Sequence, residues 1–237
     1  MFLFWRLILS HVLGDFPLQT DTIYYFKARA RWGRFLHGAI FILLNFLLGW
    51  PYLGNKLVLT ILIGIGLLHA LTDGIKITFK SRYYQGETIL TFLSDQFIHL
   101  AIIGLAIIPL RLPPPPVLSS HGLASLYYND IFIFYAIAYT FVSFGGFIFS
   151  TALKNTFAKT IVSVDLLPPL QKFYGLIERA IITLLVMKGF NLWPILLAVS
   201  PRLVPPLKRK IGGWSDVFIN YCLGLTIGLI LRTIERV

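Results

Sequence analysis

Residues 57–76 read LVLTILIGIGLLHALTDGIK, and this stretch decides the fold class. Its first part, Leu57–Thr72, contains no Asp, Glu, Lys or Arg. A helix needs about 20 apolar residues to cross the hydrocarbon core of a bilayer. Because lipid offers backbone amides no partners, a helix is the default conformation for such a segment. The stretch therefore predicts a transmembrane helix whose last turn carries His69 and Asp73.

Seven further segments predict that the chain crosses a membrane repeatedly. Together with Leu57–Lys76 they indicate an all-α, polytopic transmembrane bundle of about eight spans. The seven segments are Phe2–Gly14, Phe35–Asn55, Thr88–Leu110, Ile131–Leu153, Leu166–Met187, Asn191–Leu207 and Val217–Leu231. The seventh span, Asn191–Leu207, is interrupted by four prolines, so seven spans plus a re-entrant segment are the alternative.

Composition agrees with a membrane location. The 237 residues are 57% hydrophobic and 13% charged, more apolar surface than a soluble protein of this size can bury. The formal net charge is +11, and the basic residues concentrate in the segments after spans one, three, five and seven. By the positive-inside rule those segments are cytoplasmic, and we expect a multi-pass protein of the bacterial cytoplasmic (inner) membrane. This placement of charge argues against nucleic acid as a partner.

The chain divides at a run of four prolines, Pro113–Pro116, which forms a stiff connection. We expect residues 1–110 to form a four-helix half, residues 111–130 an outer proline-rich loop, and residues 131–237 a second helical half of one integrated membrane domain. A single cysteine, Cys222, excludes a metal site built from several thiolates.

Histidines and aspartates recur at one depth of the first four spans. In three pairs they are four residues apart, which places both side chains on one helix face. With alternating helix directions, all of them fall near the predicted cytoplasmic end. The set is His11, Asp15, His37, His69, Asp73, Asp95 and His99.

A metal is the simplest reason for this convergence. An ionisable group inside a span costs about 2.5–3.5 kcal/mol on insertion scales, so such groups are functional candidates by default. Imidazoles and carboxylates are ligands for a divalent cation, with zinc as the leading candidate. The set exceeds the needs of one tetrahedral zinc, so either two metals or one metal beside an acid–base pair is expected. Further polar residues of the predicted site are Gln19, Lys27, Lys76, Gln96, Glu178 and Arg179.

Three motifs carry a family resemblance: His11-Val-Leu-Gly-Asp15, His69-Ala-Leu-Thr-Asp73 and Asp95-Gln96-Phe-Ile-His99. With these motifs the sequence resembles a bacterial family of polytopic membrane proteins known as domain of unknown function 3307. The segment Gly175–Arg179 extends the resemblance into the second half. The helix-borne His and Asp motifs are also similar to those of the membrane-bound metal-dependent hydrolases, a likeness of pattern.

Three functions fit these patterns. The leading hypothesis is a metal-dependent hydrolase acting on a lipid or lipid-linked substrate at the cytoplasmic leaflet, with membrane lipids as partners. In it the metal activates water, and Glu87 or Asp21 is the candidate general base. The alternatives are an ion or metal transporter that uses the same intramembrane site, and a non-catalytic scaffold with a structural metal.

Overall fold

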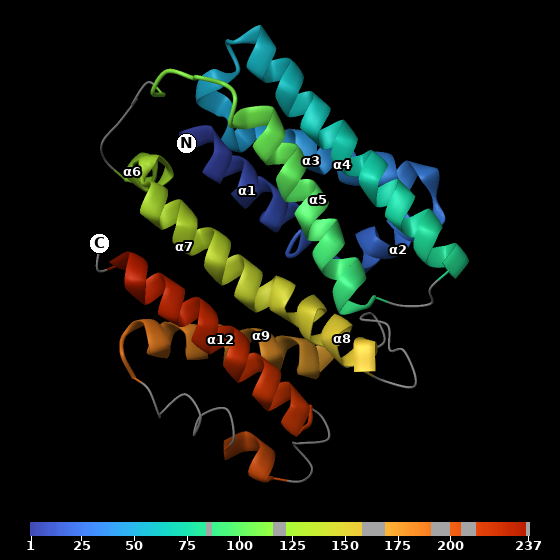
Figure 1. Ribbon diagram of the computed structural model, residues 1–237, viewed down its shortest axis with the longest axis vertical. Coiled ribbons are helices and arrows are strands. Elements are labelled where there is room, and N and C mark those ends of the chain that lie inside the picture. The colour runs from blue at the N-terminus through green and yellow to red at the C-terminus, as the bar shows by residue number, and fades with distance from the viewer. Residues whose placement is uncertain (84–86, 116–121, 158–168, 191–199, 205–211, 236–237) are drawn as a thin grey trace. The chain divides into compact units, whose positions relative to one another are not determined.

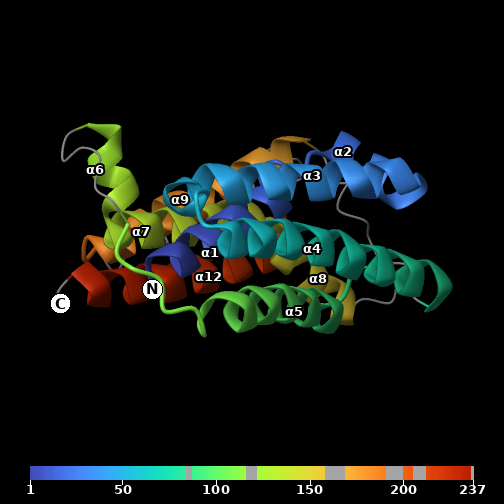
Figure 2. The same cartoon turned by 90° about the horizontal axis from the view of Figure 1, so that it is seen from above.

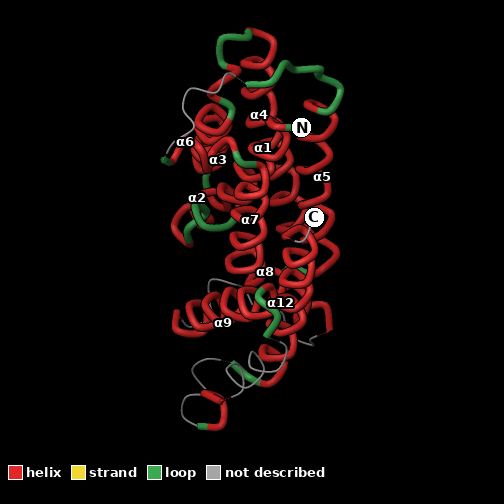
Figure 3. Tube along the Cα trace, turned by 90° about the vertical axis from the view of Figure 1, so that its left-hand side faces the viewer, coloured by secondary structure: helices red, strands yellow, loops and turns green. Residues whose placement is uncertain are grey.

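The computed structural model describes residues 1–83, 87–115, 122–157, 169–190, 200–204 and 212–235, and the regular secondary structure in these ranges is helical (Figures 1 and 3). The chain forms two compact units. The first comprises residues 1–85 and 90–137, and the second comprises residues 86–89 and 138–237. Each unit is described by itself below.

The first unit is a helical bundle built around α3. Its elements are α1(Phe2–Asp15), α2(Asp21–Arg29), α3(Arg31–Leu48), α4(Lys56–Tyr83), α5(Ile89–Ile107) and α6(Leu123–Tyr128), followed by α7(Asp130–Thr140), within which the boundary between the units falls. Helix α3 packs against α1, α2 and α4. Figures 1 and 2 show α1, α3, α4 and α5 side by side. This arrangement brings four helices around one shared interior.

Local signals explain how the short α2 forms between two longer helices. Thr20 is its N-cap, and the Thr20 hydroxyl accepts a hydrogen bond from the Ile23 amide at 3.3 Å. Asp21 lies in the first turn, and Lys27 and Arg29 lie in the last, where they complement the helix dipole. The cap therefore fixes where α2 begins, and so fixes which of its residues face the bundle.

Close packing of α3 on α4 depends on small residues. A Cβ atom at Gly66 would lie 2.4 Å from Cγ1 of Ile42, closer than any real contact allows. In membrane interiors helices associate through van der Waals contact, and small residues permit the close approach. Gly66 thus sets the distance between the two helices that contribute His37, His69 and Asp73.

The second unit contains the π-helix Phe141–Gly145, α8(Gly146–Phe157), α9(Pro169–Met187), the 3₁₀-helix Ser200–Leu203 and α12(Trp214–Glu235). Ile182 and Val186 of α9 are buried against Val217, Tyr221 and Leu225 of α12. Helix α12 comes close because a Cβ atom at Gly224 would lie 2.6 Å from Cγ2 of Ile182. The pairing of α9 with α12 is therefore the core of this unit.

Four helices in the described part of the chain are long and apolar enough to cross a membrane. They are Lys56–Phe79, Ile89–Ile107, Asp130–Phe157 and Trp214–Glu235. These four correspond to predicted spans three, four, five and eight, so the membrane character of the chain is supported while the count of eight is not confirmed.

The other predicted spans fall short for separate reasons. Helix α1 has only 14 residues, and the apolar part of α3 is the shorter segment Trp32–Leu48. Helix α9 carries Lys172, Glu178 and Arg179 within 19 residues. Predicted span seven falls at residues 191–207, which lie mostly outside the described ranges. Length accounts for predicted spans one and two and charge for span six, while span seven lies mostly outside the residues that the structure describes.

We predict that Gly66→Ala lowers the melting temperature of the detergent-purified protein, because the new methyl group must displace Ile42. Overpacking of this kind costs about 1–3 kcal/mol. Gly64→Ala is the matched control, since a Cβ atom there meets nothing within 4 Å. The control should be neutral or stabilising, because Ala favours the helix over Gly. Equal melting temperatures for the two variants would contradict the assigned α3–α4 contact.

Candidate metal centre

Four helices of the first unit bring their ionisable side chains to one buried point. Helix α1 supplies His11 and Asp15, α3 supplies His37, α4 supplies His69 and Asp73, and α5 supplies Asp95 and His99. The four histidines are at most 3% exposed, and Asp15 and Asp73 are buried as well. The structure thus brings together all seven residues predicted as metal ligands.

The innermost four atoms of this cluster lie close to one another. Nε2 of His37 lies 3.4 Å from Oδ1 of Asp15, 3.3 Å from Oδ2 of Asp73 and 3.4 Å from Nε2 of His69. The Nε2 atom of His69 lies 3.3 Å from the same Asp15 oxygen and 3.4 Å from the same Asp73 oxygen. Each imidazole nitrogen is thus nearly equidistant from both carboxylate oxygens and from the other imidazole nitrogen.

These separations match a tetrahedral metal site. With zinc–nitrogen and zinc–oxygen bonds of about 2.0–2.2 Å, the ligand atoms of a regular tetrahedron are about 3.3–3.6 Å apart. The same four residues form one of the buried groups whose ligand atoms all lie within 4.8 Å of one another. His37, His69, Asp15 and Asp73 therefore form a buried group that could hold a divalent cation.

Charge in the cluster is only partly compensated by lysines. The Lys27 ammonium, from α2, donates to Oδ2 of Asp73 at 2.9 Å and also to Oε1 of Gln19. Lys76 donates to Oδ2 of Asp95 at 2.8 Å. Among the described residues, Asp15 pairs only with histidines. A buried carboxylate needs a compensating positive charge, which a cation or a protonated imidazole would supply.

Neighbouring groups hold the remaining imidazoles in place. Nε2 of His11 lies 3.1 Å from Oε1 of Gln96, and Nε2 of His99 lies 2.8 Å from the Thr72 hydroxyl. The Phe41 ring stacks on His69 with 3.5 Å between ring centroids. Second partners of this kind fix both the tautomer and the direction of a ligating imidazole.

The other predicted site residues divide into those that contact the His/Asp cluster and those that lie away from it. Lys27, Lys76 and Gln96 contact the cluster directly, and Gln19 contacts it through Lys27. Asp21, a candidate general base, is exposed at the start of α2 and belongs to none of the described metal-binding groups. Glu87, the other candidate, belongs to the second unit, where its carbonyl accepts a hydrogen bond from Asn155 at 3.0 Å.

Glu178 and Arg179 form a separate polar centre in the second unit. The fully buried Arg179 guanidinium donates to the carbonyls of Val142 and Ser143 at 2.7 and 2.6 Å, and to Oδ1 of Asn220 at 2.8 Å. Asn220 in turn donates to Glu178 at 2.5 Å. A π-helix frees carbonyls from the regular ladder, so Arg179 stabilises the π-helix Phe141–Gly145 and ties it to α9 and α12.

Sequence reasoning missed several buried groups of the first unit. Arg6 is fully buried in α1, with its guanidinium 3.5 Å from the Phe2 ring centroid and hydrogen bonded to Asp130. Tyr127 lies beside it; burial raises the pKa of this phenol, which donates to the Leu48 carbonyl at 2.7 Å. A lone arginine within the apolar stretch Phe2–Gly14 was the signal that could have identified this anchor.

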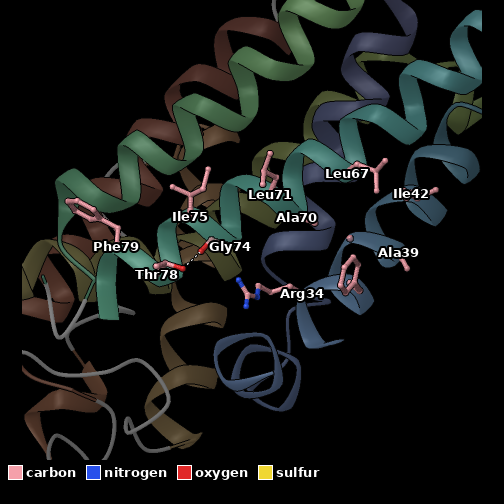
Figure 4. Close-up of a pocket in the computed structure, with 12 residues that line it drawn as sticks. Arg34, Ala39, Ile42, Leu67, Ala70, Leu71, Gly74, Ile75, Thr78 and Phe79 are labelled. Carbon is pink, nitrogen blue, oxygen red and sulfur yellow. Dashed lines mark hydrogen bonds between the residues drawn. The ribbon is translucent and has the colours of Figure 1, made fainter. Parts of the chain in front are cut away.

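A groove of about 920 Å³ runs between α3 and α4 (Figure 4). Small residues form much of its floor, among them Ala39, Ala70 and Gly74, and the Arg34 side chain reaches toward Gly74 at one end. The Thr78 hydroxyl near that end donates to the Gly74 carbonyl at 2.8 Å. The groove is thus apolar along its length and cationic at one end.

These features define a class: an all-helical protein with membrane-length apolar helices and a buried His/Asp centre that can hold a metal ion. Residues 3–113, which include every residue of the centre, match the family model described as protein of unknown function (DUF3307). No curated protein and no solved structure matches the chain. The family match therefore covers the part of the chain that carries the candidate site.

We predict that Arg179→Met destabilises the protein by about 3–5 kcal/mol, because it leaves the carbonyls of Val142 and Ser143 and Oδ1 of Asn220 buried without their donor and removes the positive charge beside Glu178. Lys188→Met is the matched control, since Lys188 forms an exposed ion pair with Glu235 at 2.8 Å. Exposed pairs contribute at most about 1 kcal/mol. Thermal unfolding in detergent should show a large shift for the first variant alone; equal shifts would remove the role assigned to Arg179.

Proposed function

We propose that this chain is a membrane-embedded, zinc-dependent hydrolase that acts on a lipid or lipid-linked substrate at the cytoplasmic leaflet of the bacterial inner membrane. One observation carries the proposal: Nε2 of His37 and Nε2 of His69 each lie 3.3–3.4 Å from one oxygen of Asp15 and one oxygen of Asp73, and 3.4 Å from each other. A bound divalent cation supplies Lewis acidity and lowers the pKa of a coordinated water.

The donor set favours zinc over magnesium or calcium. Both of those cations prefer oxygen ligands, and magnesium demands octahedral geometry at short distances. Two imidazoles and two carboxylates in tetrahedral array are typical of zinc. The buried excess of negative charge at Asp15 is a further reason for a cation at this point.

The groove of Figure 4 supports contact with an anionic lipid. Each residue turns a helix by about 100°, so Ala70 and Gly74 of the groove lie about 100° around α4 from His69 and Asp73, on a different face of the helix. The groove is therefore a docking site beside the centre and not the reaction chamber. Its apolar walls suit an acyl or prenyl chain, and Arg34 suits a phosphate.

The complete topology belongs to this proposal. Four helices qualify as spans by length and composition alone. We propose that α1, α3 and α9 also lie within the membrane, where their polar groups bind one another, and that the chain has about eight spans. The basic residues of α2, Lys27 and Arg29, would then lie on the cytoplasmic side.

A structural zinc is the second candidate, and a specific observation favours it. Catalytic zinc sites keep one position open for water, whereas structural sites are closed by four protein ligands. His37, His69, Asp15 and Asp73 already account for four positions. A staple of this kind would join α1, α3 and α4 and add the free energy of metal binding to folding.

We predict about one equivalent or more of zinc in the purified wild-type protein and at least about a tenfold lower content in Asp73→Asn. The variant keeps the shape of the side chain but removes the anionic ligand. Glu235→Gln, at an exposed position, is the control and should keep its zinc. Zinc should also leave at acidic pH, because the imidazoles must be neutral to bind.

Turnover separates the two candidates. Purified protein loaded with zinc should hydrolyse a phospholipid or polyprenyl phosphate, and Asp73→Asn should not. If the protein binds zinc but hydrolyses no lipid, and Asp73→Asn has a lower melting temperature, the hydrolase hypothesis is rejected in favour of a structural zinc. Absence of zinc after supplementation at neutral pH would contradict both.

We predict that Arg34→Gln weakens the binding of phosphatidylglycerol about fivefold, equivalent to about 1 kcal/mol for one basic residue at the membrane surface. Native mass spectrometry of the protein with phosphatidylglycerol or phosphatidylcholine would measure retention of each lipid. Arg29→Gln is the charge-matched control, because Arg29 lies over the Tyr25 ring, 4.1 Å from its centroid. If both variants lose phosphatidylglycerol binding equally, the lipid binds through general basic charge and not specifically at the groove.

A further inference from the structure

Two imidazole nitrogens lie beside the proposed zinc site but are not among its four ligands. Nδ1 of His11 and Nδ1 of His99 are buried and have no hydrogen-bond partner in the described part of the chain. Their side chains are 1% and 2% exposed. Buried polar atoms are nearly always paired, so two neighbouring exceptions call for a ligand.

Hydrogen bonds fix which nitrogen of His11 carries the proton. The amide of Gln96 donates from its nitrogen to Oδ2 of Asp95 at 3.3 Å, and this contact directs the amide oxygen toward His11. That oxygen accepts from Nε2 of His11 at 3.1 Å. The proton therefore sits on Nε2, and Nδ1 of His11 carries the lone pair.

A corresponding arrangement is available to His99. The Thr72 hydroxyl lies 3.0 and 2.9 Å from the carbonyls of Leu68 and His69 in its own helix, and 2.8 Å from Nε2 of His99. When the hydroxyl donates to a carbonyl, its oxygen accepts from Nε2 of His99, and Nδ1 of His99 carries the lone pair that a metal ligand requires.

Carboxylate oxygens face both lone pairs. Oδ2 of Asp15 lies 3.7 Å from Nδ1 of His11, while Oδ1 of the same carboxylate belongs to the tetrahedral site. Oδ1 of Asp95 lies 3.8 Å from Nδ1 of His99. Both separations exceed the distance of about 3.0 Å between adjacent ligands of an octahedral metal with 2.1 Å bonds, so a bound cation would draw each pair of atoms closer together.

We infer that a second divalent cation binds between Nδ1 of His11, Nδ1 of His99 and Oδ2 of Asp15, so that the Asp15 carboxylate bridges two metals. His11, Asp15, His69 and His99 form a buried group whose ligand atoms lie within 4.8 Å of one another. The inference rests on the proposed function for the first metal and adds a second, chemically distinct position.

The two positions differ in what they leave open. Four protein ligands close the first, whereas three hold the second, with Asp95 at its edge. A cavity of about 10 Å³ adjoins His11, His69 and His99, close to the minimum size for one water molecule. A cation held by His11, His99 and Asp15 would keep coordination positions open for a water that it could activate, and the first cation would fix Asp15 and the helices around it.

Manganese is a suitable probe, because electron paramagnetic resonance distinguishes an exchange-coupled pair from isolated ions. Wild-type protein loaded with Mn²⁺ should bind two equivalents and show the coupled signal. The double variant His11→Gln/His99→Gln should bind one equivalent and lose the coupling, while its melting temperature in the loaded state shows that it is folded. Asp15→Asn, which removes the bridge, should lose the coupled signal and weaken both positions.

Each outcome decides the matter. One equivalent in both the wild type and the double variant would overturn the second position and leave the first, and with it the proposed function, standing. No tightly bound metal in the wild type would remove both. Two equivalents in the double variant would place the second cation away from His11 and His99, and would also overturn the inference.

Discussion

The burial of Asp15 without a lysine or arginine partner is the constraint on which the rest of the first unit depends. A carboxylate taken out of water needs a positive charge and donors around it, or its burial costs several kcal/mol. Asp73 and Asp95 meet this need through Lys27 and Lys76. Asp15 instead faces His11, His37 and His69 from three different helices. A cation at this point would satisfy all of them at once, and would account for the convergence of four helices on one buried point.

Small residues and short elements make this convergence geometrically feasible. Gly66 lets α3 approach α4, and α1 contributes both His11 and Asp15 from only 14 residues. Helix α2 begins at a capped position and directs Lys27 back to Asp73. The fold thus combines a dry, close-packed interior with one polar point, where low dielectric strengthens every interaction between charges.

Sequence alone predicted the helical class and the convergence of seven His and Asp residues, because hydropathy and the four-residue spacing of His and Asp are local signals. Asp95 and His99, for example, share a helix face whatever surrounds them. The number of spans was harder to predict, since α9 hides Glu178 and Arg179 in a polar centre that only tertiary structure reveals. The tautomers of His11 and His99 could not be predicted from the sequence either, because they depend on contacts with Gln96 and Thr72 of neighbouring helices.

The division of labour between two metal positions follows from ligand number. A zinc ion with four protein ligands has no free position, so a reaction at that ion alone would require one ligand to dissociate. Asp15 is the natural bridge because its two oxygens face different sets of imidazoles. A carboxylate shared in this way lets the closed position fix the geometry while the other exchanges water, and this arrangement uses all four histidines of the cluster. A single metal would leave the lone pairs of His11 and His99 buried without a partner.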